Sequence, residues 1–354
     1  MTPAATPDLR LFDRFPATRF LGSKRKLLPA LAVVFASLEF DAALDPFSGT
    51  GAVAYLLKCL GKRVTACDAL EANAVAARAL VVNPGARLGP GIDALLRDLP
   101  EPGAAPGFVE RTFDGVFFEA DENRFIDQIL PRASALPGFR RDLALWALFQ
   151  ACLAKRPYNL FHRANLAMRR RDVARSFGNK ATWDTPFPEL MRRFAAEADA
   201  AVFDSGAPHV ALVGDALAID PGGAELVYLD SPYVSSRRVG VDYLDYYHFL
   251  EGLCRPEAWG ARVLRKYRHL PLAGRGESPW CDPARISGAF ETAIARFACA
   301  KLVVSYRSDG IPAIDDIARW MRKAGKRVEI TDVGKYTYAL SRNRASREVI
   351  LKGV

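Results

Sequence analysis

The chain has 354 residues, of which 50% are hydrophobic, and a formal net charge of +9. A chain of this length can bury a full core and suggests two domains, or one large domain with an insertion. It has no apolar run of about 18 residues and no apolar segment near its charged N-terminus, which argues against a membrane span and a secretory signal. We therefore expect a soluble, cytoplasmic protein. The cysteines form no Cys-x-x-Cys pair, so neither a disulfide framework nor a metal site is expected.

Short apolar segments that end in an acid or a small residue recur along the chain and predict strands. Helix-like segments at 52–60 and 70–82 separate the first of them, and this alternation is typical of parallel strands joined by crossover helices. We therefore expect an α/β fold with a mainly parallel sheet of about seven strands. The expected strands span residues 41–45, 63–68, 209–215, 225–230, 301–306, 327–333 and 347–353.

The alternation of strand and helix stops at about residue 83 and resumes at about residue 205. Within this interval, residues 120–153 are typical of helix. From Lys155 to Lys180 there are eight basic residues against one acid, a local charge of +7, interleaved with aromatic residues. This composition is typical of a surface that binds nucleic acid. We therefore expect a helical, basic insertion at 83–204 in a domain formed by residues 1–82 and 205–354.

A glycine-containing loop, Asp-Pro-Phe-Ser-Gly-Thr-Gly, follows the first expected strand and precedes a helix. Gly49 and Gly51 would let the backbone approach a ligand at the helix N-terminus, and Asp68, at the end of the next strand, could accept both hydroxyls of a ribose. The loop also fits the NAD fingerprint G-x-G-x-x-G/A, so an NAD-dependent oxidoreductase is an alternative. Asp45 favours S-adenosylmethionine, because a carboxylate attracts the ammonium of its methionyl group and repels a pyrophosphate.

The strand at 225–230 ends in an Asp-Ser-Pro-Tyr corner. In open α/β sheets, ligands bind at the carboxyl ends of the strands, where this corner would lie. The Asp230 carboxylate and the Ser231 carbonyl could hold both hydrogens of adenine's exocyclic amine, which would aim the nitrogen lone pair at an electrophilic methyl group. Pro232 would fix the corner, and Tyr233 could stack on the base, which must be flipped out of a duplex. An ordinary strand-to-turn boundary is the alternative interpretation.

Three motifs, in this order, resemble those of the Dam-like (alpha-group) DNA adenine-specific methyltransferases, which use S-adenosylmethionine. They are the Phe-x-Gly-Ser-Lys segment at 20–24, the loop at 45–51, which is similar to D-P-F-x-G-x-G, and the corner at 230–233, where Ser231 replaces the first proline of D-P-P-Y. The resemblance covers most of the chain. It implies a Rossmann-like class I methyltransferase sheet in which the insertion is the target-recognition domain, and it implies no metal.

The resemblance also implies a site-specific DNA-methyltransferase (adenine-specific) whose partner is double-stranded DNA, with a separately encoded restriction nuclease as a further candidate partner. Methylation of RNA stays an alternative, because a flipped adenine is the same in both polymers, and so does a non-catalytic DNA-binding protein on this fold. The expected catalytic residues are Asp230, Ser231, Pro232 and Tyr233. The expected cofactor-binding residues are Phe20, Gly22, Ser23, Lys24, Asp45, Phe47, Gly49, Gly51, Asp68 and Asp215.

Cations in the insertion and after the corner are the expected DNA contacts. They would neutralise phosphates, so binding should weaken as salt rises. Three consecutive arginines at 169–171 cannot all face one way on a helix, so an exposed helix face with solvated or paired cations is the alternative. The expected DNA-binding residues are Arg163, Arg169, Arg170, Arg175, Lys180, Arg237 and Arg238.

Overall fold

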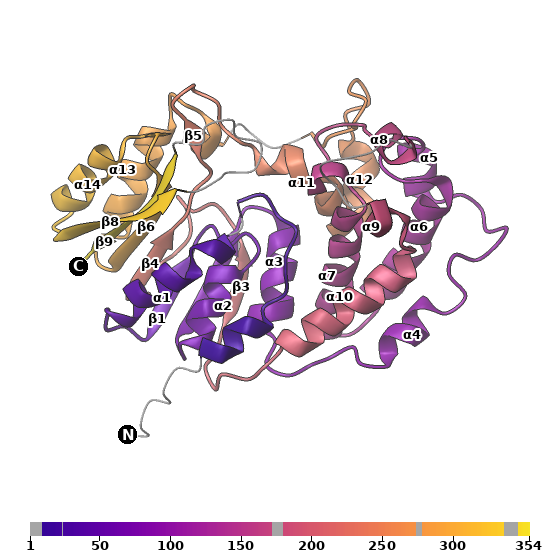
Figure 1. The fold of residues 1–354 in the computed structure, drawn as a ribbon, viewed down its shortest axis with the longest axis horizontal. Helices are drawn as coiled ribbons and strands as arrows, with labels where there is room; N and C mark the ends of the chain where they lie inside the picture. Colours follow the sequence, from indigo (N-terminus) through magenta and orange to yellow (C-terminus); the bar gives the residue numbers. More distant parts are fainter. Residues whose placement is uncertain (1–8, 23, 172–179, 274–277, 336–345) are drawn as a thin grey trace.

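A seven-stranded sheet forms the centre of the computed structural model, which describes residues 9–22, 24–171, 180–273, 278–335 and 346–354 (Figure 1). The strand order is β3-β2-β1-β4-β6-β9-β8, with β9 antiparallel to both of its neighbours and the other strands parallel. The expected α/β fold with a mainly parallel sheet is thereby confirmed. The strands are β1 (Ala42–Asp45), β2 (Arg63–Asp68), β3 (Val210–Val213), β4 (Leu226–Leu229), β6 (Lys301–Arg307), β8 (Val328–Lys335) and β9 (Arg347–Gly353).

Helices cover both faces of this sheet. Successive side chains of a strand point to opposite faces, so Val303 packs into the core on one face while Leu302 and Val304 pack into the core on the other. Because both faces are buried, the central strands are almost continuously apolar. One face carries α1 (Leu28–Ala36), α2 (Ala52–Cys59) and α3 (Glu71–Ala77), and the other carries α13 (Ile286–Arg296) and α14 (Ile314–Lys323).

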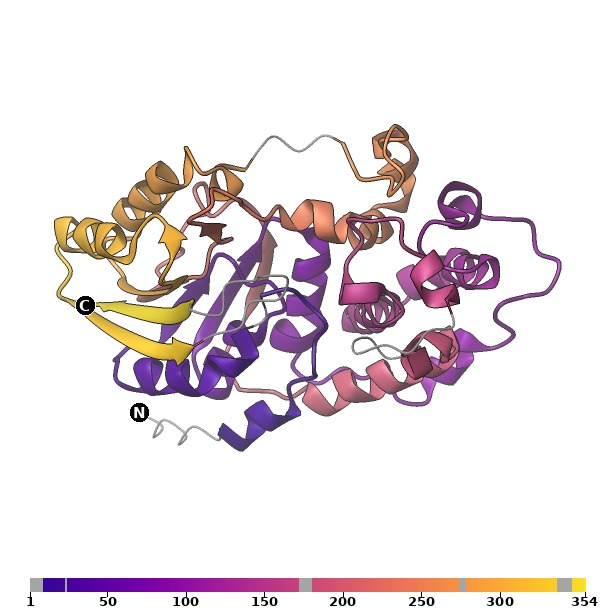
Figure 2. The ribbon, with the colours of Figure 1, turned by 45° about the horizontal axis from the view of Figure 1, so that its top comes forward.

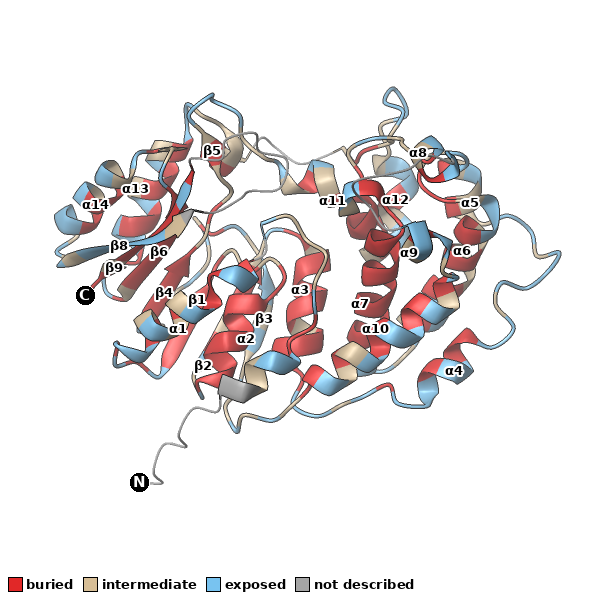
Figure 3. Ribbon diagram, in the orientation of Figure 1, coloured by how far each residue is buried: buried red, intermediate tan, exposed pale blue. Residues whose placement is uncertain are grey.

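A helical lobe lies beside α3, at the edge of the sheet domain (Figures 1 and 2). Its central helix, α7, is buried along almost its whole length and contacts α3, α6 and α10 (Figure 3). The helices of residues 83–204 are α4 (Gly91–Leu96), α5 (Phe108–Phe113), α6 (Ala120–Ser134), α7 (Phe139–Ala154), α8 (Ala167–Arg170), α9 (Lys180–Asp184) and α10 (Phe187–Ala201).

Two helices from a later part of the chain also belong to this lobe. These are α11 (Tyr243–Cys254) and α12 (Pro256–Arg262), which follow the Asp-Ser-Pro-Tyr corner. Phe249 of α11 stacks on Phe161 with ring centroids 5.0 Å apart, and Trp259 of α12 packs against Phe113 of α5 at 5.2 Å. The helical lobe is therefore built from two segments of the sequence. Among the described residues, no helix is both long enough and apolar enough to cross a bilayer.

Candidate active site

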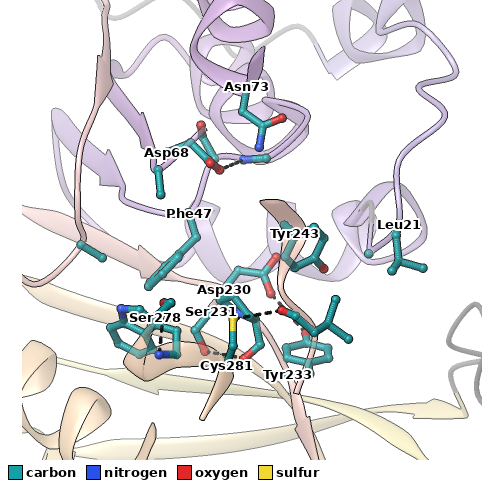
Figure 4. Close-up of a pocket in the computed structure, with 18 of the residues that line it drawn as sticks. Leu21, Phe47, Asp68, Asn73, Asp230, Ser231, Tyr233, Tyr243, Ser278 and Cys281 are labelled. Carbon is teal, nitrogen blue, oxygen red and sulfur yellow. Dashed lines mark hydrogen bonds between the residues drawn. The ribbon is translucent and has the colours of Figure 1, made fainter. Parts of the chain in front are cut away.

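A cavity of about 1300 Å³ opens at the carboxyl ends of the parallel strands. The segments that follow β1, β2, β3 and β4 all contribute to its wall, and β1 and β4 flank the point at which the strand order reverses. Ligands of open α/β sheets bind at such a switch point. In Figure 4, Asp68 and Asn73 lie towards one end of the cavity and Asp230, Ser231 and Tyr233 towards the other, with Phe47 and Tyr243 between them.

The glycine loop after β1 is held by Asp68. One oxygen of the Asp68 carboxylate accepts a hydrogen bond from the Gly49 amide at 2.9 Å, and the other accepts one from the Leu70 amide at 2.9 Å. Gly49 and Gly51 have φ angles of +50° and +79°, in the left-handed region that glycine adopts without strain. Because each carboxylate oxygen has a further lone pair, Asp68 can hold the loop and still accept hydrogen bonds from a ligand in the cavity.

Two acids face the cavity close enough for their charges to interact. Asp45 ends β1 and is 1% exposed, and Asp230 follows β4. Burial, together with the charge of Asp230, raises the pKa of Asp45 well above its usual range. A cation bound between the two acids would relieve both the desolvation and the repulsion, so the cavity is suited to a positively charged ligand.

The Asp230 carboxylate lies in a small polar cluster. Lys24 Nζ is 2.8 Å from Asp230 Oδ1, and the Tyr233 hydroxyl is 3.2 Å from the same oxygen. Burial raises the pKa of Asp230 to about 6, while Lys24 and Tyr233 act to lower it. Ser231 is buried, and no donor among the described residues bonds to its backbone carbonyl. A carboxylate and a carbonyl are thus both available as acceptors at this corner.

An aromatic stack fixes the N-terminal motif against α11. The Phe20 ring stacks on Tyr247, at 4.2 Å, and on Tyr243, at 5.6 Å, and the two tyrosine rings are 6.3 Å apart. The Tyr247 hydroxyl accepts a hydrogen bond from the Leu21 amide at 2.6 Å. Gly22 has a φ of +82°, and a Cβ atom there would lie 2.6 Å from the Tyr243 hydroxyl oxygen, so only glycine fits. This packing brings Lys24 to Asp230.

Residues 20–270 match the family of D12 class N6 adenine-specific DNA methyltransferases. The chain belongs to this family. The methyltransferase is also 26% identical over 246 residues to the type II methyltransferase M2.HphI of Haemophilus parahaemolyticus, an alignment that covers 67% of this chain and 71% of the relative. The expected DNA adenine methyltransferase activity is confirmed at the level of the family, which sets aside the oxidoreductase alternative.

Most of the predicted site residues of the methyltransferase line this one cavity. Gly51 is the N-cap of α2 and directly follows the lining residue Thr50, and Ser23 lies outside the described residues. Asp215, after β3, lines the cavity while its Oδ1 accepts a hydrogen bond from the Leu217 amide at 2.9 Å. The predicted residues found in the wall are Phe20, Gly22, Lys24, Asp45, Phe47, Gly49, Asp68, Asp215, Asp230, Ser231, Pro232 and Tyr233.

Several residues of the site carry no recognisable sequence signal. Trp280 lines the cavity, and its ring packs edge-on against Phe47 at 4.8 Å. Glu348, on β9, is 1% exposed, and its Oε1 accepts a hydrogen bond from the Tyr233 hydroxyl at 2.6 Å. Both residues come from the last quarter of the chain and reach the site through the tertiary fold, so no local motif could reveal them.

The structure corrects one expected DNA contact, Arg169. This arginine is 9% exposed, and its guanidinium makes two bonds of 2.7 Å to the carboxylate of Glu122. Lys155 is also buried and lies 2.6 Å from the same carboxylate. Burial acts to raise the pKa of Glu122, but its bonds to Arg169 and Lys155 outweigh burial and lower it. Arg169 therefore stabilises the helical lobe from within, and it is not a surface cation.

The other expected DNA contacts differ in how available they are. Arg170 bonds to Glu119 at 2.6 Å, and Lys180 bonds to Asp184 at 2.8 Å, so each has an acidic partner on the surface. Arg237, which lines the cavity, and Arg238 are exposed. They follow β5 (Val234–Ser235), which pairs with β7 (Gly310–Ile311). Arg163 is exposed, and Arg175 lies outside the described residues.

We predict that Arg169→Ala lowers the free energy of unfolding by about 3 to 5 kcal/mol, because it leaves the charge of Glu122 incompletely paired in the interior. Arg170→Ala is the matched control, since it removes a neighbouring arginine that is 59% exposed and should leave stability nearly unchanged. Urea unfolding of both variants measures the difference. A stable Arg169→Ala protein with a reduced salt dependence of DNA binding would instead make Arg169 a phosphate contact.

Proposed function

We propose that this methyltransferase transfers a methyl group from S-adenosylmethionine to the exocyclic amine of an adenine flipped out of double-stranded DNA. The observation that carries the proposal is the presence, in one cavity, of a nucleoside-type loop held by Asp68 and a two-acceptor corner at Asp230 and Ser231. The type II relative extends the proposal to restriction-modification, with a separately encoded nuclease as partner.

The residues present fit S-adenosylmethionine. Asp45 and Asp230 would offset the positive charges of its ammonium and sulfonium groups, and Asp68 would accept the ribose hydroxyls. The Ser48 hydroxyl oxygen is buried at the cavity and has no hydrogen-bond partner among the described residues, so it is available to a bound ligand. When bound, this cofactor supplies an electrophilic methyl group. Among the described residues, no cluster of three or more side chains could hold a metal ion.

We predict that Asp68→Ala weakens S-adenosylmethionine binding at least about tenfold, because hydrogen bonds to a charged group contribute about 1.5 to 3 kcal/mol. Isothermal titration calorimetry measures this affinity. Asp220→Ala, which removes an exposed acid of a turn outside the cavity, is the control and should bind normally. Wild-type binding by Asp68→Ala would contradict the proposed cofactor position.

Asp230 and Ser231 would make the adenine amine nucleophilic by position. The lone pair of this amine is delocalised into the ring, and two acceptors that hold its hydrogens favour the pyramidal form whose lone pair points at the methyl donor. Unstacking the base costs a few kcal/mol, and an aromatic side chain that stacks on it returns about 1 to 3 kcal/mol. After transfer, the extra proton on the amine can leave through Asp230 Oδ or through water.

The proposed function is tested by mapping modified adenines in the DNA of cells that express the wild type or Asp230→Ala. We expect one shared sequence motif to carry methylated adenine with the wild type and none with the variant, because removing one such acceptor lowers kcat about 100- to 1,000-fold. Circular dichroism and thermal unfolding of Asp230→Ala check that the variant is folded. Identical maps for the two proteins would overturn the assignment of Asp230.

The pH dependence of the reaction should follow the ionisation of the Asp230 carboxylate. The carboxylate is an acceptor only when ionised, and its pKa of about 6 lies above the ordinary aspartate range. We predict that kcat/KM, which reports the free enzyme, is constant above about pH 7 and falls tenfold per pH unit below about pH 6. A profile that stays flat down to pH 4.5 would show that Asp230 acts without its charge.

A basic hairpin tip supplies a DNA surface that the motifs did not reveal. Residues 263 and 272 pair as an antiparallel bridge, and the tip between them carries Arg265, Lys266 and Arg268 around Tyr267, which is 45% exposed. Within the described residues, these three cations make no ion pair. The orange tip projects from the helical lobe on the same side of the molecule as β5 (Figure 1), so DNA lying over the cavity could reach it.

We predict that replacing Arg265, Lys266 and Arg268 together with alanine weakens DNA binding at low salt. Each lost phosphate contact lowers the slope of log affinity against log salt by about 0.9, so the slope should fall by about 2 to 3. Fluorescence anisotropy over a salt series measures it. The matched control is alanine at Arg319, Arg322 and Lys323, three exposed cations of α14 in the sheet domain. An unchanged slope in the hairpin variant would remove the tip from the interface.

A further inference from the structure

The arrangement around Asp230 contains a second buried acid that the proposed reaction does not use. Glu348 lies on β9, opposite Arg307 of β6, and is 1% exposed. It does not line the cavity, but it contacts two residues that do. The Tyr233 hydroxyl donates a hydrogen bond to Glu348 Oε1 at 2.6 Å, and Lys24 Nζ lies 3.9 Å from the same oxygen.

Lys24 therefore lies between two carboxylates. Its ammonium is in hydrogen-bond contact with Asp230, at 2.8 Å, and at the limit of an ion pair with Glu348. The ammonium also lies over the ring of Tyr233, 4.5 Å from its centroid, and the hydroxyl of that ring is within hydrogen-bond reach of both acids. Lys24 is 7% exposed, so water gives little compensation for any charge left unpaired.

This geometry creates a conflict for the proposed reaction. The Asp230 carboxylate must accept a hydrogen bond from a neutral amine, yet a lysine ammonium, a stronger donor, is bonded to it in the free protein. An acceptor already neutralised by a cation polarises an amine less. Lys24 and Tyr233 both contact Oδ1, so Oδ2 is open to the amine, but the carboxylate regains its full negative charge for that bond only when the ammonium moves to another anion. Glu348 is an anion within reach of the ammonium.

We propose that Glu348 is a positioning residue that anchors Tyr233 and takes over Lys24 when the target amine binds, which releases the Asp230 carboxylate. The inference rests on the proposed function, because it assigns Asp230 as the acceptor for the amine. A shift of Lys24 Nζ towards Glu348 Oε1, which is 3.9 Å away, is sufficient for this exchange of partners. The Tyr233 hydroxyl is within hydrogen-bond reach of both acids.

Glu348→Gln tests the proposal, because glutamine keeps an oxygen that can accept the hydrogen bond of Tyr233 and loses the charge. We expect kcat/KM for DNA to fall about 10- to 100-fold, the usual loss when a supporting residue of a site is changed. The cofactor affinity should not change. Glu329→Gln, on the exposed side of β8, is the matched control and should behave as the wild type.

The pH profile separates this role from a purely structural one. The charge of Glu348 raises the pKa of Asp230, and the hydroxyl of Tyr233 lowers it. The acid limb is the part of the pH profile in which kcat/KM falls as the pH is lowered. Glu348→Gln should therefore move this limb to lower pH, whereas Tyr233→Phe should move it to higher pH. In the described part of the chain, the charged and titratable groups that face Asp230 are Lys24, Asp45, Tyr228, Tyr233, Tyr243 and Glu348, and the control leaves all of them in place.

Carboxyl ¹³C NMR of Asp230 in the free protein gives a second measurement that needs no substrate. The same opposite shifts in its titration are expected for the two variants, and equal titration in the wild type and Glu348→Gln would overturn the proposal. If Glu348→Gln does not fold, Glu348→Asp keeps the charge and should keep the wild-type acid limb with a reduced kcat. A wild type that methylates no adenine would refute the proposed function, whereas normal methylation by Glu348→Gln with an unshifted limb would refute this inference alone.

Discussion

The ion pair between Lys24 and Asp230 is the interaction on which the site depends. It joins the N-terminal motif to the strand that ends in the Asp-Ser-Pro-Tyr corner, two segments separated in the sequence by β1, β2, β3 and the whole insertion. Holding a carboxylate in a buried place costs free energy unless a cation compensates it. The lysine therefore keeps Asp230 close to ionisation near neutral pH, and the aromatic stack of Phe20 on α11 keeps the lysine in place.

The sheet domain and the helical lobe differ in where their charged side chains lie. The sheet domain brings Asp45, Asp68 and Asp230 to the carboxyl ends of three strands, so that one cavity holds three acids. Some cations of the helical lobe are paired in its interior, where Arg169 and Lys155 both bond to the carboxylate of Glu122. Other cations, exposed ones, follow β5 and lie at the hairpin tip, two segments on the same side of the molecule (Figure 1).

The sequence was sufficient for those features that depend on local rules. Short apolar runs, four of which end in an aspartate, locate all seven strands, and the positive φ angles of Gly49 and Gly51 agree with the predicted turn. It was insufficient where partners are distant in the chain. The carboxylate of Glu122, which pairs with the buried Arg169, lies 47 residues away in the sequence. The sequence alone therefore could not divide the basic stretch into interior and surface cations. Glu348 reaches the site only through the antiparallel register of β9 on β6, which no motif encodes.

Because α11 and α12 belong to the helical lobe, they matter for any exchange of this lobe between enzymes. The polypeptide that leaves the corner at Tyr233 runs into the aromatic core of the lobe, where Phe249 and Trp259 pack on residues of the insertion. Transplanting residues 83–204 alone into another scaffold would separate this core from its own partners. A chimera that keeps this core intact must carry residues 243–262 as well, so the helical lobe is a module formed from two separate segments of the chain.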